Sequence, residues 1–484
     1  MKIPEKGLPR EQLFARLEAF RAGDVDWRSG RTWAYVYDPG REAEEVVKHA
    51  FSTYLSENGL DPTAFPSALA LENEIVAMAI AHLHGDARVV GTFTSGGTES
   101  IILAVKAARD RARALSPEIR EPEMVLPETA HAAFHKAAHY LDVRPVVVPV
   151  EPTSFRADVG AMRNAIGPRT ILLVGSAVSY AHGVVDPIRE IGALALERDL
   201  LLHVDGCMGG FLLPYLRRLG EPIPDFDWRV PGVTSISMDF HKYAFAAKGA
   251  SVVMYRDREL RRHQIYACAG WTGYTVVNPT VQSTKSAGPL AATWAVLHFL
   301  GDEGYTRLAR AMLDATRRVC AGIERIPGLR ILGSPDMNLV AFTSDEVSVF
   351  HVADEMRARR WFVQPQLAFG RSKENLHLSI NPAAGPWVEE FLADLAASVE
   401  AARALPSGVL AGSLHAALEG MDPAAPSEED FSRLLAFAGI EGDALPARMA
   451  AINEMMNALA PPMREALLIE YVNRLYRPVG EVAP

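Results

Sequence analysis

A lysine that directly follows a short apolar run is the residue of this sequence best placed for chemistry. The apolar, β-favouring residues 233–238 lead into the sequence DFHK, which ends at Lys242, and a second β-favouring run follows at 250–255. Burial at such a turn can lower the pKa of a lysine and leave its amine nucleophilic. A surface lysine that ends a strand is the more common explanation, so Lys242 needs support from the rest of the chain.

A glycine-containing segment, TSGGTES at residues 94–100, lies between a predicted strand and a predicted helix. Its glycines let the backbone approach an anion, and the helix that follows offers free N–H groups and the positive end of its dipole. A tight strand-to-helix turn with a Ser or Thr cap explains the segment equally well. The segment is neither a Walker motif nor the dinucleotide-binding G-x-G-x-x-G.

Two further polar residues follow apolar runs, and both can serve in cofactor binding. Asp205, in the sequence HVDGC, ends an apolar strand, where a carboxylate needs a cationic partner or hydrogen-bond donors. A protonated pyridine nitrogen is one such partner, although an Asp that caps a helix is the more common explanation. His131, in the sequence ETAHAAF, starts a predicted helix, where its imidazole can either lie flat on an aromatic ring or face solvent.

Taken in their order along the chain, these four features are the parts that a pyridoxal 5'-phosphate (PLP) site requires. The glycine segment would hold the phosphate, His131 would stack on the ring, and Lys242 would form the Schiff base. Asp205 would keep the pyridinium charged, so that the ring acts as an electron sink. Each signal is weak alone, but their joint occurrence in this order favours a PLP enzyme.

Short apolar runs alternate with helical patterns through the first half of the chain. Strands are predicted at 89–94, 123–127, 143–150, 170–175, 200–204, 235–238 and 251–255. Helices are predicted at 68–84, 99–114, 132–140, 159–166 and 187–197, and two long ones at 288–301 and 307–326. This alternation predicts an α/β fold with a mostly parallel sheet covered by helices on both faces.

The chain is predicted to have four parts. An N-terminal arm occupies residues 1–65, a large cofactor-binding domain 66–315 and a smaller α+β domain 316–404. Residues 405–484 form a linker followed by C-terminal helices, with helical patterns at 446–459 and 462–476.

Composition excludes several classes of protein. The 484 residues carry a net charge of -10 with no run of Lys or Arg, which argues against nucleic-acid binding. No window reaches the roughly 18 apolar residues of a membrane span. The three cysteines, Cys207, Cys268 and Cys320, lack metal-ligand spacing and fit a reducing compartment. We therefore expect a cytoplasmic protein without a metal site.

The sequence resembles the PLP-dependent group II decarboxylase superfamily of fold type I, and within it most closely the sphingosine-1-phosphate lyases. The residues that carry the resemblance are 94–100 (TSGGTES), 130–138 (AHAAFHKAA), 182–187 (HGVVDP), 203–211 (HVDGCMGGF), 233–249 (VTSISMDFHKYAFAAKG) and 294–295 (WA). The pattern HVD-x-C-x-GGF and the two lysines of HKY-x-x-x-x-KG are typical of the lyase branch. Amino-acid decarboxylases of the superfamily usually carry Asp-Ala-Ala at the first of these.

The resemblance implies a role for each matching residue. It also decides which lysine binds the cofactor, because local composition alone does not distinguish Lys242 from Lys248. It makes Lys242 the Schiff-base lysine and Asp205 the partner of the pyridine nitrogen. The other cofactor contacts that it implies are His131 on the ring, Ser176 near the ring hydroxyl, and Gly97, Thr98 and His241 on the phosphate. It also implies that Lys248 assists acid–base steps or binds the substrate phosphate.

The resemblance further implies a homodimer whose active sites lie at the subunit interface, with Tyr37 in an arm that reaches the partner's site. The implied reaction is a retro-aldol cleavage of a small amino substrate, which displaces Lys242 from the cofactor. Sphingosine 1-phosphate, or a similar phosphorylated amino alcohol, would give a long-chain aldehyde and phosphoethanolamine. Binding energy from the phosphate and the chain would align the breaking bond.

The expected substrate-binding residues depart from the lyase pattern. The family's Asn-x-Leu-His reads Asn58, Gly59, Leu60 and Asp61 here, and an Asp close to a phosphate repels it. Slippage of the alignment, or an Asp61 that points to solvent, would remove the conflict. Where the family has Ser-Arg-Pro-Gly, this sequence has Lys285 in place of the Arg. A guanidinium that can bind an anion through two hydrogen bonds is thus replaced by a single ammonium charge.

Two rival functions remain open at this point. A PLP-dependent amino-acid decarboxylase keeps the cofactor, and Lys285 would then meet a substrate carboxylate. A catalytically silent protein with the same fold, acting as a binding partner, is the other. The retention of Lys242, Asp205 and His131 together argues against a silent protein.

Overall fold

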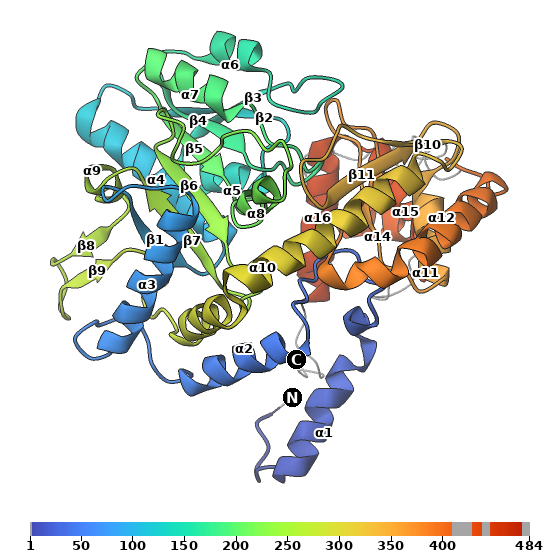
Figure 1. Cartoon of the computed structure of the whole chain (residues 1–484), viewed down its shortest axis with the longest axis horizontal. Coiled ribbons are helices and arrows are strands. Elements are labelled where there is room, and N and C mark those ends of the chain that lie inside the picture. The colour runs from blue at the N-terminus through green and yellow to red at the C-terminus, as the bar shows by residue number, and fades with distance from the viewer. Residues whose placement is uncertain (1, 409–427, 438–445, 477–484) are drawn as a thin grey trace.

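The computed structural model describes residues 2–408, 428–437 and 446–476. Its large domain contains a seven-stranded sheet (Figure 1). In spatial order the strands are β1 (Val90–Thr94), β7 (Ser251–Tyr255), β6 (Ser235–Asp239), β5 (Leu201–Asp205), β4 (Thr170–Ser176), β2 (Glu123–Pro127) and β3 (Arg144–Val148). Strand β7 is antiparallel to both neighbours and the other pairs are parallel, which confirms the predicted mostly parallel sheet.

Helices cover both faces of this sheet. They are α3 (Pro66–His82), α4 (Gly97–Leu115), α5 (Ala132–Leu141), α6 (Val159–Ala165), α7 (Ile188–Glu197), α8 (Leu213–Arg218) and α9 (Arg258–Arg261). Along β4, Leu172 and Val174 pack into a core with α4 and α5. The intervening Leu173 packs into a second core that contains Ile188 and Ile191 of α7. Because both faces are buried, the strands have continuous apolar sequences.

One long helix, α10 (Gly288–Ile323), connects the large domain to the small one. The sequence predicted two helices here, and the chain is indeed non-helical at Gly301, where φ is 57° and ψ is -178°. Met312 still packs in the large core, whereas Ala315 and Val319 pack in the small one. A single helix therefore contributes to both cores.

The small domain is an antiparallel sheet covered by helices. Its strands, in spatial order, are β10 (Leu329–Ile331), β11 (Leu339–Ser344), β13 (Asn375–Ser379) and β12 (Gln364–Gln366). Its helices are α11 (Val349–Ala358), the 3₁₀ helix Pro382–Trp387 and α12 (Val388–Arg403). This arrangement matches the predicted smaller α+β unit.

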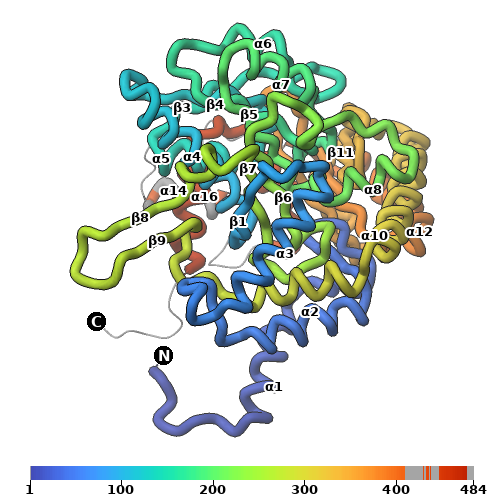
Figure 2. The backbone as a smooth tube through the Cα atoms, turned by 60° about the vertical axis from the view of Figure 1, so that its left-hand side comes forward, coloured from blue at the N-terminus to red at the C-terminus, as the bar shows by residue number. Residues whose placement is uncertain are grey.

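The N-terminal arm is divided between three environments. Helix α1 (Arg10–Phe20) has no buried residue and projects from the body, and it is followed by 3₁₀ turns at Arg21–Gly23 and Trp27–Ser29 (Figures 1 and 2). Trp33 is fully buried in the small domain, where its ring stacks on Phe391 with centroids 4.0 Å apart. Helix α2 (Arg41–Thr53) then packs along α10, with Phe51 against Gly288.

A hairpin that the sequence did not predict projects from the large domain (Figure 2). It consists of β8 (Tyr266–Cys268) and β9 (Val276–Asn278). Trp271 and Tyr274, in its connecting loop, are 49% and 63% exposed. Its strands are three residues long and largely exposed, so they lack the buried apolar run by which the other strands were found.

The C-terminal helices are α14 (Glu428–Phe437), α15 (Ala450–Ala458) and α16 (Pro461–Leu475). The last two match the predicted helices, while most of the predicted linker lies outside the described residues. The buried carboxylate of Asp354 in α11 accepts hydrogen bonds from the N–H groups of Met449 and Ala450, each at 2.9 Å. Asp354 therefore caps α15 and attaches it to the small domain.

Among the described residues, no helix is both long enough and apolar enough to cross a membrane.

Replacement of Trp33 tests the attachment of the arm to the small domain. Trp33→Ala removes a fully buried indole that also donates a 2.9 Å hydrogen bond to the carbonyl of Gly30. We expect a loss of about 3–5 kcal/mol, seen as a lower midpoint of thermal unfolding. Phe20→Ala, at an 82% exposed position, is the matched control. An equal shift in the two variants would contradict this assignment.

Candidate active site

Lys242 lies in a compact loop between the antiparallel strands β6 and β7. The N–H groups of Phe240 and His241 both donate to the carbonyl of Ala250 at 3.0 Å, which closes the loop against β7. The Lys242 Nζ lies 3.0 Å from Oδ2 of Asp239, the last residue of β6. Only 2% of the Asp239 side chain and 17% of the Lys242 side chain are exposed. The loop thus fixes a buried lysine–carboxylate pair at the end of a central strand.

The electrostatics of Lys242 differ from the sequence-based expectation. Burial lowers the pKa of the Lys242 ammonium. The negative charge of Asp239, together with Cys207 and Tyr37, raises this pKa by more than burial lowers it, so the net pKa is raised. The prediction of a lowered pKa is therefore wrong in this structure. The sequence could not reveal that the side chain of Asp239 turns toward the lysine.

The glycine segment packs directly against this pair. Helix α4 starts at Gly97, immediately after β1 and the turn at Gly96, where φ is 153°. A Cβ at Gly97 would lie 2.7 Å from Sγ of Cys207 and 2.9 Å from both carboxylate oxygens of Asp239. These distances leave no room for a side chain. Thr98, in the first turn of α4, is exposed.

Hydroxyl groups connect the glycine segment to the strands that carry Lys242. Oγ1 of Thr94 lies 2.6 Å from Oγ of Ser100, which in turn lies 2.9 Å from Oγ of Ser251 on β7. Ser251 donates to the carbonyl of Met238 on β6 at 3.1 Å. All three hydroxyl-bearing side chains are fully buried. This chain of hydrogen bonds sets the start of α4 relative to the lysine loop.

Glu99, which sequence reasoning missed, holds the same segment from the other side. Its buried carboxylate accepts hydrogen bonds from the N–H of Ser95 at 2.6 Å and from the N–H of Val281 at 2.7 Å. It therefore joins the glycine segment to the chain that follows the β8–β9 hairpin. A Glu at the start of a predicted helix, just after the glycine segment, was the available signal, since such a Glu often reaches back to the backbone before the helix.

Asp205 and His241 both lie near Lys242. Asp205 ends β5, and its Oδ1 accepts from the N–H of Cys207 at 3.0 Å and from the hydroxyl of Ser237 at 3.3 Å. Nε2 of His241 lies 3.5 Å from Asp239, and burial lowers the pKa of the imidazole. The Cε1 of His241 would lie 3.5 Å from a Cβ at Gly96, so this ring borders the glycine segment.

Ser176 and His131 complete the predicted cofactor residues. Ser176 ends β4 directly beside Asp205, and its buried hydroxyl has no hydrogen-bond partner. His131 caps α5, its Nδ1 accepting from the N–H of Ala133 at 3.1 Å. The exposed imidazole lines a cavity of about 320 Å³ that it shares with Tyr180.

These residues fit a PLP cofactor. Glycines at a helix start suit a phosphate, the carboxylate at the end of β5 suits a protonated ring nitrogen, and the unpartnered hydroxyl of Ser176 is free to bind a polar ring substituent. The amine of Lys242 pairs with the carboxylate of Asp239, and the same carboxylate borders Gly97. Within the described residues, no cluster of three or more His, Cys, Asp or Glu side chains can hold a metal ion.

Tyr37 and Lys248 lie together next to the lysine loop of their own chain. The ring of Tyr37 meets Tyr243 edge-on with centroids 5.1 Å apart, and Nζ of Lys248 lies 4.6 Å from the centre of the Tyr37 ring. Burial lowers the pKa of Lys248, and the positive charge of Lys242 lowers it further. Burial raises the pKa of Tyr37. The structure therefore places the arm at the site of the same chain.

Tyr180 is a second residue that sequence reasoning missed. Its hydroxyl donates to Oε1 of Gln364 in the small domain at 2.6 Å, and its ring stacks on His377 with centroids 4.5 Å apart. Burial raises the pKa of Tyr180, while the nearby charge of Lys242 acts in the opposite direction. An aromatic residue a few positions after a predicted strand was the signal available.

The predicted substrate-binding residues Asn58, Asp61 and Lys285 lie near one another, but each is engaged within the protein. Asn58 accepts from the N–H of Leu60 at 3.1 Å. Asp61 is exposed and accepts from the N–H and hydroxyl of Thr63 at 2.8 and 2.6 Å, which lower its pKa. The carboxylate of Asp61 thus closes its own turn.

Lys285 is 7% exposed, and its ammonium is paired with the carboxylate of Glu72 in α3. It also donates to the carbonyl of Phe93 at 3.3 Å, while the N–H of Phe93 donates to Glu72 at 2.9 Å. These contacts hold β1 just before the glycine segment. Lys285 therefore lacks the free ammonium that the expected contact with a substrate anion requires.

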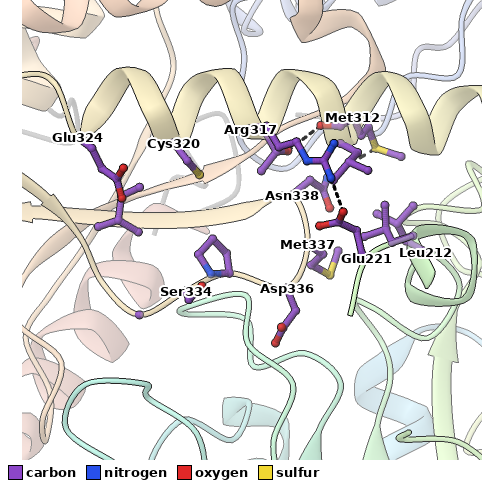
Figure 3. Close-up of a pocket in the computed structure, with 16 residues that line it drawn as sticks. Leu212, Glu221, Met312, Arg317, Cys320, Glu324, Ser334, Asp336, Met337 and Asn338 are labelled. Atoms are coloured by element: carbon purple, nitrogen blue, oxygen red, sulfur yellow. Dashed lines mark hydrogen bonds and ion pairs between the residues drawn. The ribbon is translucent and has the colours of Figure 1, made fainter. Parts of the chain in front are cut away.

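A second cavity, of about 230 Å³, lies between α10 and the edge of the small domain (Figure 3). Arg317 of α10 forms an ion pair with Glu221 at one side of it, and residues 334–338 line it from the opposite side. None of the predicted site residues lines this cavity. We therefore assign the chemistry to the site around Lys242.

The sheet order and the group of residues around Lys242 define a PLP-dependent enzyme of fold type I. The chain belongs to the family described as "Pyridoxal-dependent decarboxylase conserved domain", whose model matches residues 2–345. Residues 412–474 match a second model, "Pyridoxal-dependent enzyme, C-terminal putative HTH domain".

Within this family the chain is similar to sphingosine-1-phosphate lyases. It is 41% identical to that of Oryza sativa over 85% of this chain and 76% of the relative, and 40% identical to that of Arabidopsis thaliana over 85% and 75%. The structure of the Burkholderia pseudomallei sphingosine-1-phosphate lyase superposes with a TM-score of 0.80 at 38% identity, over 87% of this chain and 97% of that one. These findings confirm the resemblance seen in the sequence.

Replacement of Gly97 tests the geometry of the glycine segment. In Gly97→Ala the new methyl group would collide with Cys207 and the Asp239 carboxylate, so helix α4 must shift. We expect the dissociation constant for PLP to rise about tenfold or more, which is roughly 1.4 kcal/mol, in a spectroscopic titration. Gly167→Ala is the matched control, because its Cβ would meet nothing closer than 3.9 Å. Equal PLP affinity in both variants would refute the collision.

Replacement of Lys285 separates a positioning role from substrate binding. Lys285→Met leaves the carboxylate of Glu72 without its cation, and we expect a loss of about 3–5 kcal/mol in the free energy of unfolding. Lys285→Arg, which keeps the charge, should lose far less. A Lys285→Met variant of normal stability but with a strongly raised KM would instead support a substrate contact.

Proposed function

We propose that this protein is a PLP-dependent carbon–carbon lyase. Its reaction would be the retro-aldol cleavage of sphingosine 1-phosphate, or of a similar phosphorylated amino alcohol, to a long-chain aldehyde and phosphoethanolamine. The observation that carries the proposal is 41% identity to a sphingosine-1-phosphate lyase over 85% of the chain. The intact group of Lys242, Asp205, His131 and the glycine segment supports it.

The chain's own residues divide the work of holding the cofactor. Gly97, Thr98 and the start of α4 would bind its phosphate, and Asp205 would accept a hydrogen bond from its ring nitrogen. His131 would stack on the ring. PLP, once held, supplies an electron sink for the electrons released when a bond next to the substrate amine breaks.

Acid–base steps would fall to Lys248 and Tyr37. The reaction needs a base for the hydroxyl proton of the substrate and an acid that returns a proton to carbon. Because its pKa is lowered by burial and by Lys242, Lys248 gives up a proton more readily than an ordinary lysine. Tyr37, with a raised pKa, keeps its hydroxyl proton and serves better as a donor. Their 4.6 Å contact places both groups beside the lysine loop.

Asp61 need not repel the phosphate group of the proposed substrate. The carboxylate of Asp61 is exposed and bound by Thr63, so its charge is screened by water and turned to its own loop. In the alternative role that the resemblance implies for it, a protonated Lys248 would attract the substrate phosphate, and its ammonium donates to the carbonyl of His241 at 3.4 Å. This arrangement is compatible with a phosphorylated substrate.

We further propose a cytoplasmic homodimer with active sites at the subunit interface. The projecting α1 and the exposed hairpin residues Trp271 and Tyr274 are surfaces that a second copy can cover. The three cysteines are all free, which fits a reducing compartment.

Product analysis tests the proposed reaction against its rival. Incubation of the PLP-loaded enzyme with sphingosine 1-phosphate should release a long-chain aldehyde, and Lys242→Ala should abolish this release. A panel of amino acids should yield no carbon dioxide. Carbon dioxide from one of them, with no aldehyde from the lipid, would instead establish the alternative, a PLP-dependent amino-acid decarboxylase.

A further inference from the structure

A small-domain loop, residues 366–372, forms one wall of the cavity that His131 lines. Leu367 and Phe369 of this wall loop face the cavity from the small domain, and Tyr180 and Phe155 face it from the large domain. The side chain of Phe369 is 53% exposed. The wall loop therefore presents apolar surface next to the candidate active site.

On one side the wall loop is attached to the large domain. The N–H of Arg371 donates to Oε1 of Glu128 at 3.0 Å, and Nε2 of His182 lies 3.0 Å from Oγ of Ser372. A Cβ at Gly370, where φ is 53°, would lie 2.1 Å from Oε2 of Glu128. The close approach of Glu128 thus requires glycine at this position.

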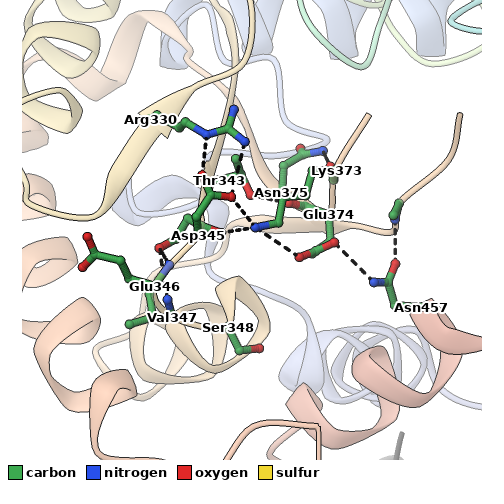
Figure 4. A network of polar contacts seen from close by, with 12 residues as sticks. Arg330, Thr343, Asp345, Glu346, Val347, Ser348, Lys373, Glu374, Asn375 and Asn457 are labelled. Carbon is green, nitrogen blue, oxygen red and sulfur yellow. Dashed lines mark hydrogen bonds and ion pairs between the residues drawn. The ribbon is translucent and has the colours of Figure 1, made fainter. Parts of the chain in front are cut away.

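On its other side the wall loop is attached to the C-terminal helices. The N–H of Ala368 donates to Oδ1 of Asn457 in α15 at 2.6 Å, and Nη1 of Arg464 in α16 donates to the carbonyl of Ala368 at 3.2 Å. Both backbone polar groups of Ala368 are therefore bound by side chains from α15 and α16. Asn457 also donates to Glu374 at 3.4 Å, as part of a polar network at this edge (Figure 4).

Arg464 is itself held in place by its own unit. Its Nε donates to the carbonyl of Leu459 at 2.8 Å and its Nη2 to the carbonyl of Asn457 at 2.9 Å. The guanidinium thus bridges the turn between α15 and α16 to the wall loop. Because Asp354 fixes the start of α15 on the small domain, these contacts come from an anchored unit.

We propose that α15 and α16 belong to the substrate site, with Asn457 and Arg464 as positioning residues that fix the wall loop through Ala368. The wall loop, through Leu367 and Phe369, contacts the apolar chain of the substrate. The C-terminal helices thereby set the affinity for long-chain substrates, while the chemistry at Lys242 does not depend on them. This inference rests on the proposed function only for the identity of the ligand.

Kinetics of Asn457→Ala test this role. Loss of the acceptor for the Ala368 N–H should raise KM for a long-chain phosphorylated amino alcohol about tenfold and leave kcat within about twofold. KM for a short-chain analogue and the visible spectrum of bound PLP should not change. Arg448→Ala is the matched control, because it breaks the exposed 2.8 Å pair with Glu355 beside α15 without touching the wall loop.

Hydrogen exchange supplies a readout that needs no substrate. Asn457→Ala and the milder Arg464→Lys should both speed exchange at the amides of residues 367–372, and Arg448→Ala should not. Faster exchange in a protein without lyase activity would support the attachment and refute only the proposed reaction. Unchanged exchange, or an equal rise of KM for long and short substrates, would overturn the inference.

Discussion

The site depends on one buried carboxylate, Asp239, at the end of β6. A carboxylate that is 2% exposed needs a cation, and the 3.0 Å contact with Lys242 supplies it. The same carboxylate borders Gly97, so the lysine and the glycine segment are set against a common group. The hydroxyl chain through Ser100 and Ser251 then fixes the start of α4 on these strands. These contacts fix the cofactor residues relative to one another, which suits a site that must position a ring and a phosphate together.

The cavity next to this site is shared by several parts of the chain. His131 and Tyr180 come from the large domain, and the wall loop comes from the small domain. Gln364 accepts from the hydroxyl of Tyr180, and Asn457 and Arg464 hold the wall loop from the C-terminal side. The substrate side therefore depends on how these units pack, whereas the cofactor side is built within one sheet.

The sequence predicted the mostly parallel sheet because its strands follow from local pattern, whereas the roles of the cofactor residues remain predictions that the resemblance supplied. Strands buried on both faces are apolar throughout, and Asp205 and Lys242 stand where two of them end. Contacts between distant residues could not be predicted in this way. The partner of Lys285 is Glu72, 213 positions earlier, and only the fold reveals that this lysine is buried. The pKa of Lys242 was mispredicted for the same reason, since its sign depends on where the side chain of Asp239 points.

Chemical trapping tests the central claim, that Lys242 and not Lys248 holds the cofactor. The PLP-loaded enzyme would be reduced with borohydride, digested, and mapped by mass spectrometry for the pyridoxyl group. The buried pairing of Lys242 with Asp239 beside the glycine segment predicts the label on Lys242. Label on Lys248, whose ammonium lies over the ring of Tyr37, would contradict the account.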